Sequence, residues 1–182
     1  MAERRRSRGR LRRARQVASP NCDARPAGSQ VTLAVLHSIS LPPGEYGGDA
    51  IERLFTNRLD PQAHPYFEGI ASMKVSAHFL VRRDGALVQF VPIHLRAWHA
   101  GVSSWRGRER CNDFSLGIEL EGVDDAPFAD AQYRTLVDLL LSLRRLLPLR
   151  DVAAHSDVAP GRKTDPGARF DWARVLSALA AR

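Results

Sequence analysis

Residues 155–165 read HSDVAPGRKTD, a short loop shaped by proline and glycine that carries His155, Lys163 and Asp165. A predicted strand at 151–155 leads into it. A neutral imidazole and a carboxylate ten residues apart can both bind one divalent metal ion. The lysine then lies within reach of whatever the metal binds. This combination is unusual for a loop with a purely structural role.

A second candidate metal ligand lies far upstream, at the end of an apolar run. Residues 31–37 read VTLAVLH, which predicts a short buried strand that ends in His37. If the fold joins the two places, His37, His155 and Asp165 form a three-ligand zinc site. Such a site keeps one position open for water, which is the arrangement that metal-assisted catalysis needs.

The stretch GIELEG at 117–122 supplies a candidate general base. Side chains alternate between the two faces of a strand, so Glu119 and Glu121 face away from Ile118 and Leu120. Two interpretations stay open: a solvated strand face, or a Glu119 carboxylate beside the metal that takes a proton from water and passes it to a leaving amine.

Lys163 also has two interpretations. It is either an ordinary loop lysine or, two residues from a metal ligand, a group that stabilises an oxyanion. Zinc, a carboxylate and an ammonium group together indicate metal-assisted hydrolysis of an amide or ester. The pattern leaves the substrate open.

Hydrophobic periodicity predicts one α/β domain, with a mixed sheet of four to six strands covered by about three helices. In the helix at 131–147, leucines at 136, 140, 143 and 147 form one stripe. Residues 92–113 carry few periodic signals, and we expect a long functional loop or a short helix there. The predicted strands lie at 31–37, 74–81, 86–91, 114–121 and 151–155, and the other helices at 49–57 and 170–181.

The net charge of +7 is local. Residues 1–15 hold eight arginines and one glutamate, so the remaining chain has 19 basic and 19 acidic residues. We expect residues 1–16 to form a disordered arginine-rich arm and 17–182 to form the folded domain. The alternative, an arm that binds nucleic acid, lacks the interleaved aromatic residues on which bases would stack.

The arm is not followed by the apolar stretch of about 7–15 residues that a signal peptide needs, so we expect a cytoplasmic protein. The two cysteines, Cys22 and Cys111, fit free thiols in a reducing compartment. No apolar run approaches the roughly 20 residues that span a bilayer. Of the other histidines, His99 is a candidate ligand contact, whereas loop or core positions suit the remaining three better.

Five segments closely resemble the AmpD family, the cytoplasmic 1,6-anhydro-N-acetylmuramyl-L-alanine amidases of peptidoglycan recycling. The likeness runs from about residue 17 to the C-terminus. It implies the fold of amidase-2 and peptidoglycan-recognition proteins, a mixed sheet flanked by helices. The segments are VLHSISLPPGEYGG (35–48), VSAHFLVRRDG (75–85), RAWHAG (96–101), GRERCNDFSLGIELEG (107–122) and HSDVAPGRKTDPG (155–167).

The resemblance implies Zn²⁺ on His37, His155 and Asp165, with Glu119 and Lys163 serving catalysis. The bond cut would be the amide between the lactyl group of anhydro-muramic acid and L-alanine of the stem peptide. In related phage-lysozyme amidases the third ligand is a cysteine, and the aspartate here matches the AmpD side.

The implied substrate contacts agree with the family less uniformly. Arg110, Trp98 and His99 match the family pattern, Arg110 as a group that holds a substrate carboxylate or carbonyl. Ser38 stands where asparagine is common, and Lys74 where arginine is frequent; lysine cannot make the bidentate fork of arginine.

We expect a monomer acting on a small muropeptide. Two alternatives stay open. A fragment-binding module without catalysis would typically lack a metal ligand, and none is missing here. A periplasmic amidase acting on intact murein would carry an export signal.

Overall fold

The computed structural model describes residues 9–181, and a six-stranded mixed sheet lies at its centre. Strands β4, β9, β3 and β10 are mutually parallel neighbours, β5 pairs antiparallel with β4, and β1 pairs parallel with β5. The predicted single α/β domain with a mixed sheet is therefore confirmed. The order is β1 (Arg15–Gln16), β5 (Leu87–Gln89), β4 (Phe79–Val81), β9 (Ser115–Glu121), β3 (Leu33–Ile39) and β10 (Asp151–Ala154).

The two faces of the sheet separate the core from the functional side chains. In β3, Ala34 and Leu36 join the largest hydrophobic cluster, whereas Leu33 and Val35 pack into a smaller cluster on the opposite face. Alternation along the strand therefore puts His37 on that second face. The register between β3 and β9 pairs His37 with Glu119, so both side chains leave the sheet on the same side.

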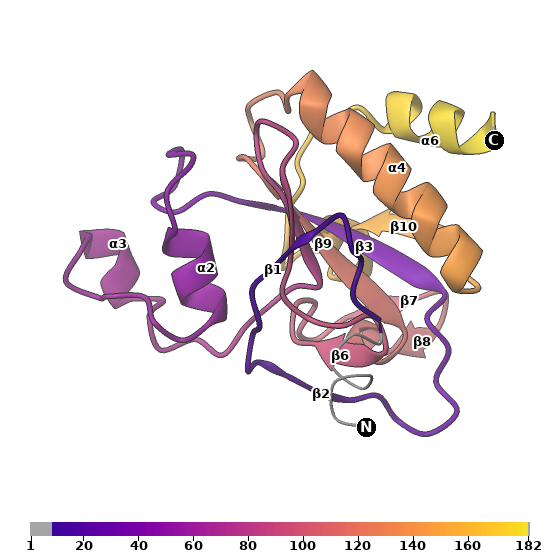
Figure 1. The fold of residues 1–182 in the computed structure, drawn as a ribbon, viewed down its shortest axis with the longest axis horizontal. Helices are drawn as coiled ribbons and strands as arrows, with labels where there is room; N and C mark the ends of the chain where they lie inside the picture. Colours follow the sequence, from indigo (N-terminus) through magenta and orange to yellow (C-terminus); the bar gives the residue numbers. More distant parts are fainter. Residues whose placement is uncertain (1–8, 182) are drawn as a thin grey trace.

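Two helices cover the first face. Helix α4 (Asp130–Leu146) crosses the sheet, and α6 (Trp172–Ala180) packs beside it (Figure 1). Three of the four leucines in the predicted α4 stripe are fully buried, and the fourth, Leu147, caps the helix end as a partly buried residue. The amphipathic pattern thus fixes which side of α4 faces the sheet.

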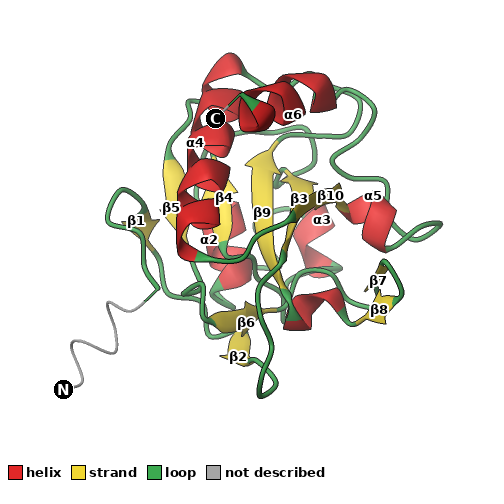
Figure 2. Cartoon of the chain, turned by 90° about the vertical axis from the view of Figure 1, so that its right-hand side faces the viewer, coloured by secondary structure: helices red, strands yellow, loops and turns green. Residues whose placement is uncertain are grey.

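A lobe formed by α2 (Ala50–Phe55) and α3 (Pro65–Glu68) lies to one side of the sheet (Figure 1). Its apolar residues pack against Leu80 of β4 and Val88 of β5 in a separate cluster. Figure 2 shows the sheet between α4 and this lobe. The lobe matters for function because it forms one wall of the cavity described below.

Short elements account for the differences from the predicted strands and helices. Residues 65–68 are helical where a loop is expected, since His64 accepts a hydrogen bond from the backbone N–H of Tyr66 and so caps α3. Likewise the strand expected at 151–155 ends one residue early. The side chain of Asp157 accepts from Ala154 N, and His155 begins the one-turn helix α5 (His155–Val158).

The segment 92–113, expected as a long loop, contains several short elements. They are β6 (Leu95–Ala97), β7 (Ser104–Trp105), β8 (Arg108–Glu109) and the 3-10 helix η1 (Cys111–Asp113). Strand β6 pairs with β2 (Cys22–Ala24), and β7 pairs with β8. Of the strand expected at 74–81, only β4 is regular.

Residues 9–16, which from the sequence we expect within the arm, lie against the sheet. Ala14 is buried, Leu11 packs on the main cluster, and Arg15 and Gln16 pair with β5. The other residues of the expected arm, 1–8, lie outside the described residues.

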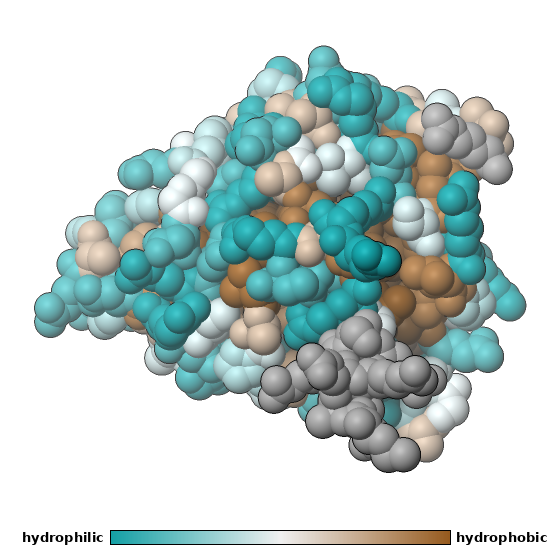
Figure 3. Space-filling model, in the orientation of Figure 1, coloured by the Kyte–Doolittle hydropathy of each residue, from teal (hydrophilic) through white to brown (hydrophobic). Residues whose placement is uncertain are grey.

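Hydrophilic side chains cover most of the face in Figure 3. Within residues 9–181, no helix combines the length and apolarity needed to cross a membrane.

Candidate metal centre

Three parallel strands bring His155, His37 and Glu119 together at their carboxyl ends. His37 pairs with Glu119 across β3 and β9, and Ala154 pairs with Leu36 across β10 and β3. His155 follows directly after β10, so it lies beside His37. In parallel sheets, ligand sites form outside the carboxyl ends of the strands, which is where these residues meet.

The two histidines and Asp165 converge on one point. The Nδ1 atoms of His37 and His155 lie 2.9 Å apart, and Asp165 Oδ2 lies 3.2 Å from the first and 3.0 Å from the second. In a tetrahedral zinc site with bonds of about 2.0–2.1 Å, ligand atoms are separated by about 3.3 Å. Since both histidines are also buried, the triangle fits one small divalent cation.

The contacts of the ring nitrogens that face away from this point suit histidines that bind a metal through Nδ1. His155 Nε2 lies 3.4 Å from the carbonyl oxygen of Ala100, which can only accept, so a ring protonated on Nε2 donates there. Its Nδ1 lone pair is then free for a metal. His37 Nε2 lies 3.0 Å from Nδ1 of His99. A metal-bound histidine commonly donates its second N–H to such a partner.

The pKa shifts of His37 and Asp165 favour the protonation states in which these residues bind a metal. Burial lowers the pKa of His37 to about 4, so its imidazole is neutral at pH 7. For Asp165, burial acts to raise the pKa, but the close contacts of its carboxylate with His155 and His37 outweigh it and hold the pKa well below its usual range. Two imidazoles and one carboxylate are a donor set typical of zinc.

Glu119 is buried beside this cluster without a partner. Only 8% of it is exposed, and its Oε2 has no hydrogen-bond partner among the residues that the structure describes. Burial raises its pKa well above the ordinary value, and the negative charge of Asp165 raises it further. The solvated strand face is therefore excluded. An unpaired buried carboxyl group with a raised pKa is suited to proton transfer.

Glu121 leaves the sheet on the same side but has a different environment. Its carboxylate pairs with Arg82 at 2.9 Å and accepts from the backbone N–H groups of Gly47 and Arg83. It therefore anchors the loop after β3, and of the two glutamates only Glu119 has a free carboxyl oxygen.

Asp124, which sequence reasoning missed, ties the metal loop to the sheet. Its Oδ1 accepts from Ser38 Oγ at 2.7 Å, and its Oδ2 accepts from Thr164 Oγ1 at 2.5 Å. Asp165 is the next residue after Thr164. No local motif marks Asp124, because its role arises only where residues far apart in the sequence meet.

A cavity of about 620 Å³ opens over the cluster. This volume falls in the range of small-molecule sites. Lys163, Trp98 and Ser38 line it together with the ligands and Glu119, and residues of the α2–α3 lobe form an apolar wall. The structure thus brings eight of the ten predicted site residues to one cavity: His37, Ser38, Trp98, His99, Glu119, His155, Lys163 and Asp165.

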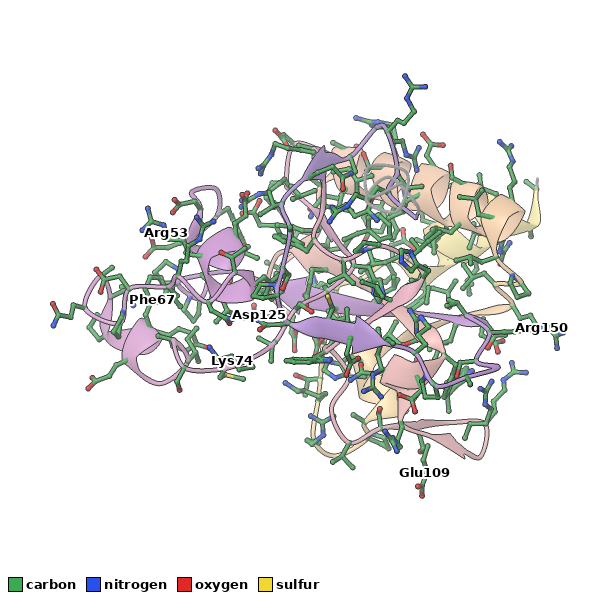
Figure 4. The ribbon with its side chains drawn as sticks, turned by 60° about the horizontal axis from the view of Figure 1, so that its bottom comes forward. Arg53, Phe67, Lys74, Glu109, Asp125 and Arg150 are labelled. Carbon is green, nitrogen blue, oxygen red and sulfur yellow. The ribbon has the colours of Figure 1, made fainter. Side chains whose placement is uncertain are left out.

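Lys74 and Arg110 are not among the described residues that line this cavity. Lys74 follows α3, between Met73 and Val75, which do line it. Arg110 lies in a neighbouring depression and forms an ion pair with Asp113 at 3.4 Å. Figure 4 shows Lys74 beside the lobe and Glu109, the residue before Arg110, at the bottom of the view.

Comparison with known proteins agrees with this geometry. The family model described as N-acetylmuramoyl-L-alanine amidase matches residues 27–168. The chain belongs to this amidase family. The curated 1,6-anhydro-N-acetylmuramyl-L-alanine amidase AmpD of Citrobacter freundii is 56% identical over 91% of this chain and 90% of its own length. The expected relationship to AmpD is therefore confirmed.

Two solved structures of amidases extend the comparison. A crystal structure of selenomethionine AmpD has a TM-score of 0.92 at 55% identity, over 94% of this chain and 97% of that one. AmiD of Escherichia coli has a TM-score of 0.60 at 29% identity, over 92% of this chain and 61% of that one. AmiD was solved in complex with its substrate anhydro-N-acetylmuramic acid-L-Ala-D-γ-Glu-L-Lys.

Proposed function

We propose that this protein is a zinc-dependent amidase of peptidoglycan recycling. Its reaction is hydrolysis of the amide between the lactyl group of 1,6-anhydro-N-acetylmuramic acid and L-alanine of the stem peptide. The observation that carries the proposal is the convergence of two histidine Nδ1 atoms and one carboxylate oxygen beside an unpaired buried carboxyl group. The 56% sequence identity to AmpD over 91% of the chain supports the choice of substrate.

His37, His155 and Asp165 would hold the zinc ion, which when bound supplies Lewis-acid chemistry and a water nucleophile at neutral pH. Glu119 is the group that moves protons. Its Oε2 accepts a proton as water attacks the amide carbon, and the same atom returns it to the departing nitrogen of L-alanine. The raised pKa of Glu119 serves both steps, because the group must gain and lose a proton in each cycle.

Lys163 lies in the loop between the two downstream ligands and lines the cavity. Its ammonium group stabilises the negative charge that develops on the carbonyl oxygen during attack. Trp98 and the apolar wall of the lobe bury part of the substrate and exclude bulk water.

The stem peptide is proposed to leave the cavity past Arg162. This residue lines both the main cavity and the depression that contains Arg110. A peptide that follows this route reaches Arg110, whose guanidinium would bind a carboxylate or carbonyl of the stem. Lys74 would act from the opposite rim. The monomeric state and the cytoplasmic location stay predictions.

The test is hydrolysis of anhydro-muramyl tripeptide by the purified protein, with mass spectrometry to locate the bond that is cut. We expect free tripeptide and intact anhydro-muramic acid, loss of activity with a zinc chelator and its return with added zinc. A folded, zinc-loaded protein that binds the fragment without cutting it would instead be a binding module.

A further inference from the structure

The segment Trp98–Gly101 contacts both histidine ligands from the side opposite to the metal position. The side chain of His99 meets His37 Nε2 at 3.0 Å, and the carbonyl oxygen of Ala100 meets His155 Nε2 at 3.4 Å. The consecutive residues His99 and Ala100 thus contact the Nε2 atoms of the two histidine ligands. A ring whose second nitrogen is held in this way keeps its orientation and presents an unprotonated Nδ1 to the metal.

Both ring nitrogens of His99 are used by protein atoms. When His37 Nδ1 binds a metal, its Nε2 carries the proton and donates to Nδ1 of His99. His99 then carries its own proton on Nε2, which lies 3.2 Å from Ser115 Oγ. The ring lies edge-on to His37, with centroids 5.0 Å apart. Although His99 lines the cavity, it has no ring nitrogen left for a substrate.

The segment is itself fixed by a side chain from η1. Asn112 Oδ1 accepts from the backbone N–H of His99 at 3.2 Å and from that of Ala100 at 2.9 Å. Arg162 donates to the carbonyl oxygen of Ala100 at 2.6 Å. These bonds hold the backbone at the two residues that face the ligands.

Gly117 provides the space for the His99 ring. It lies within β9, where glycine costs stability relative to residues with side chains and is not required by the backbone conformation. A Cβ atom at this position would lie 2.5 Å from His99 Cγ, closer than such contacts occur. A glycine in the middle of a buried strand is thus explained by the ring that packs on it.

We infer that His99 is a positioning residue for the zinc site, supported by Asn112 and Gly117, and that it does not bind the substrate. The inference rests on the proposed function, since it assumes that His37 and His155 bind zinc through Nδ1. It assigns a role to three residues that the ligand set alone leaves unexplained. His99 acts through His37, Gly117 acts through the His99 ring, and Asn112 acts through the backbone of His99 and Ala100.

Two substitutions separate positioning from other roles. His99→Phe keeps a planar ring but removes the acceptor for His37, whereas His99→Gln keeps an amide oxygen that can accept. Zinc affinity is measured by competition with a chromophoric chelator, and ligand geometry by the visible spectrum of the Co²⁺-loaded protein. We expect His99→Phe to weaken zinc binding by about 10- to 100-fold and to alter the Co²⁺ spectrum, with recovery in His99→Gln.

The control is His64→Asn, which removes a histidine that caps α3, outside the candidate ligand cluster, and replaces it with another good capping residue. It should bind zinc as the unchanged protein does. Gly117→Ala is the second test, because it keeps the histidine and displaces its ring. It should weaken zinc binding in a protein that circular dichroism shows to be folded.

Wild-type zinc affinity in both His99→Phe and Gly117→Ala overturns the inference. A raised KM at unchanged zinc affinity in His99→Phe likewise overturns it, since it would show that the ring contacts substrate. If the unchanged protein binds no zinc, the proposed function fails and the inference fails with it. The two failures are distinguished by the zinc content of the unchanged protein.

Discussion

Replacing His78 should reduce the sensitivity of the fold to acid. His78 is 0% exposed, and its Nδ1 accepts a hydrogen bond from Gly117 N at 3.0 Å. The proton of the neutral ring therefore lies on Nε2, which faces the carbonyl oxygen of Leu95 at 3.1 Å. Burial lowers the pKa of His78 to about 3, and the positive charge of Arg25, also 3.1 Å from Nε2, adds to this effect.

The magnitude follows from the difference between folded and unfolded pKa values. The unfolded chain binds a proton at His78 below a pKa of about 6.5, whereas the folded chain stays neutral until about pH 3. Between these values the unfolded state holds more protons, so the free energy of unfolding falls as the pH falls. The slope approaches about 1.4 kcal/mol per pH unit, and the loss from pH 7 to pH 4 is about 3 kcal/mol.

The assay is urea unfolding at several pH values between 7 and 4, with chelator present so that metal release does not contribute. His78→Gln is compared with the unchanged protein because glutamine does not titrate but can still donate to Leu95. The variant is expected to be less stable at pH 7. The difference in unfolding free energy should shrink by about 3 kcal/mol on going to pH 4. If the free energies of unfolding of the two proteins change with pH in parallel, the reasoning that His78 is buried in its neutral form is refuted.

Four further outcomes are expected. Glu119→Gln should retain zinc but have a much lower kcat. In the unchanged protein, activity should fall as the pH drops through the raised pKa of Glu119. A similar loss of activity at low pH in the variant would point to another base. Lys163→Ala should retain zinc and lose on the order of 10²–10³ in kcat, so an unchanged rate would make Lys163 structural. Asp124→Ala should weaken zinc binding about 10-fold, because Thr164 loses its anchor; equal zinc affinity in a titration would show that the loop holds itself. Leu136→Ala should cost about 2–5 kcal/mol in chemical denaturation with the ligand set intact, and a cost below about 1 kcal/mol would contradict its place in the core.

The strands that carry the site could be predicted because their residues encode both burial and direction. An apolar run that ends in His37, and alternation that sets Glu119 apart from Ile118, are local patterns that the sheet preserves. The spacing of His155 and Asp165 in one loop indicates a shared metal without reference to the fold. Strand ends and loop spacing are therefore enough to predict the three candidate ligands and the candidate base.

The supporting residues could not be predicted in the same way. Asp124 and Asn112 act through partners on other elements, with Thr164 and the backbone of His99 respectively. Nothing periodic marks them, since each lies in a connecting segment. The sequence marks His99 as a candidate ligand contact, but only the positions of His37 and Ser115 show what its two ring nitrogens meet.

Motif matching also located residues without showing where they lie relative to the cavity. The family resemblance predicts that Lys74 and Arg110 contact the substrate, yet one follows the lobe and the other lies in a second depression. Their roles depend on the path of the stem peptide. A sequence position alone does not define that path.

Diffraction at the zinc absorption edge, from crystals of the zinc-loaded protein, tests the central claim most directly. We predict one anomalous peak about 2.0–2.2 Å from Nδ1 of His37, Nδ1 of His155 and a carboxylate oxygen of Asp165. The Nε2 atoms of His37 and His155 should keep their contacts with His99 Nδ1 and the carbonyl oxygen of Ala100, respectively. A peak elsewhere, or coordination through Nε2 of either histidine, would contradict the proposed metal centre and the positioning role inferred for His99.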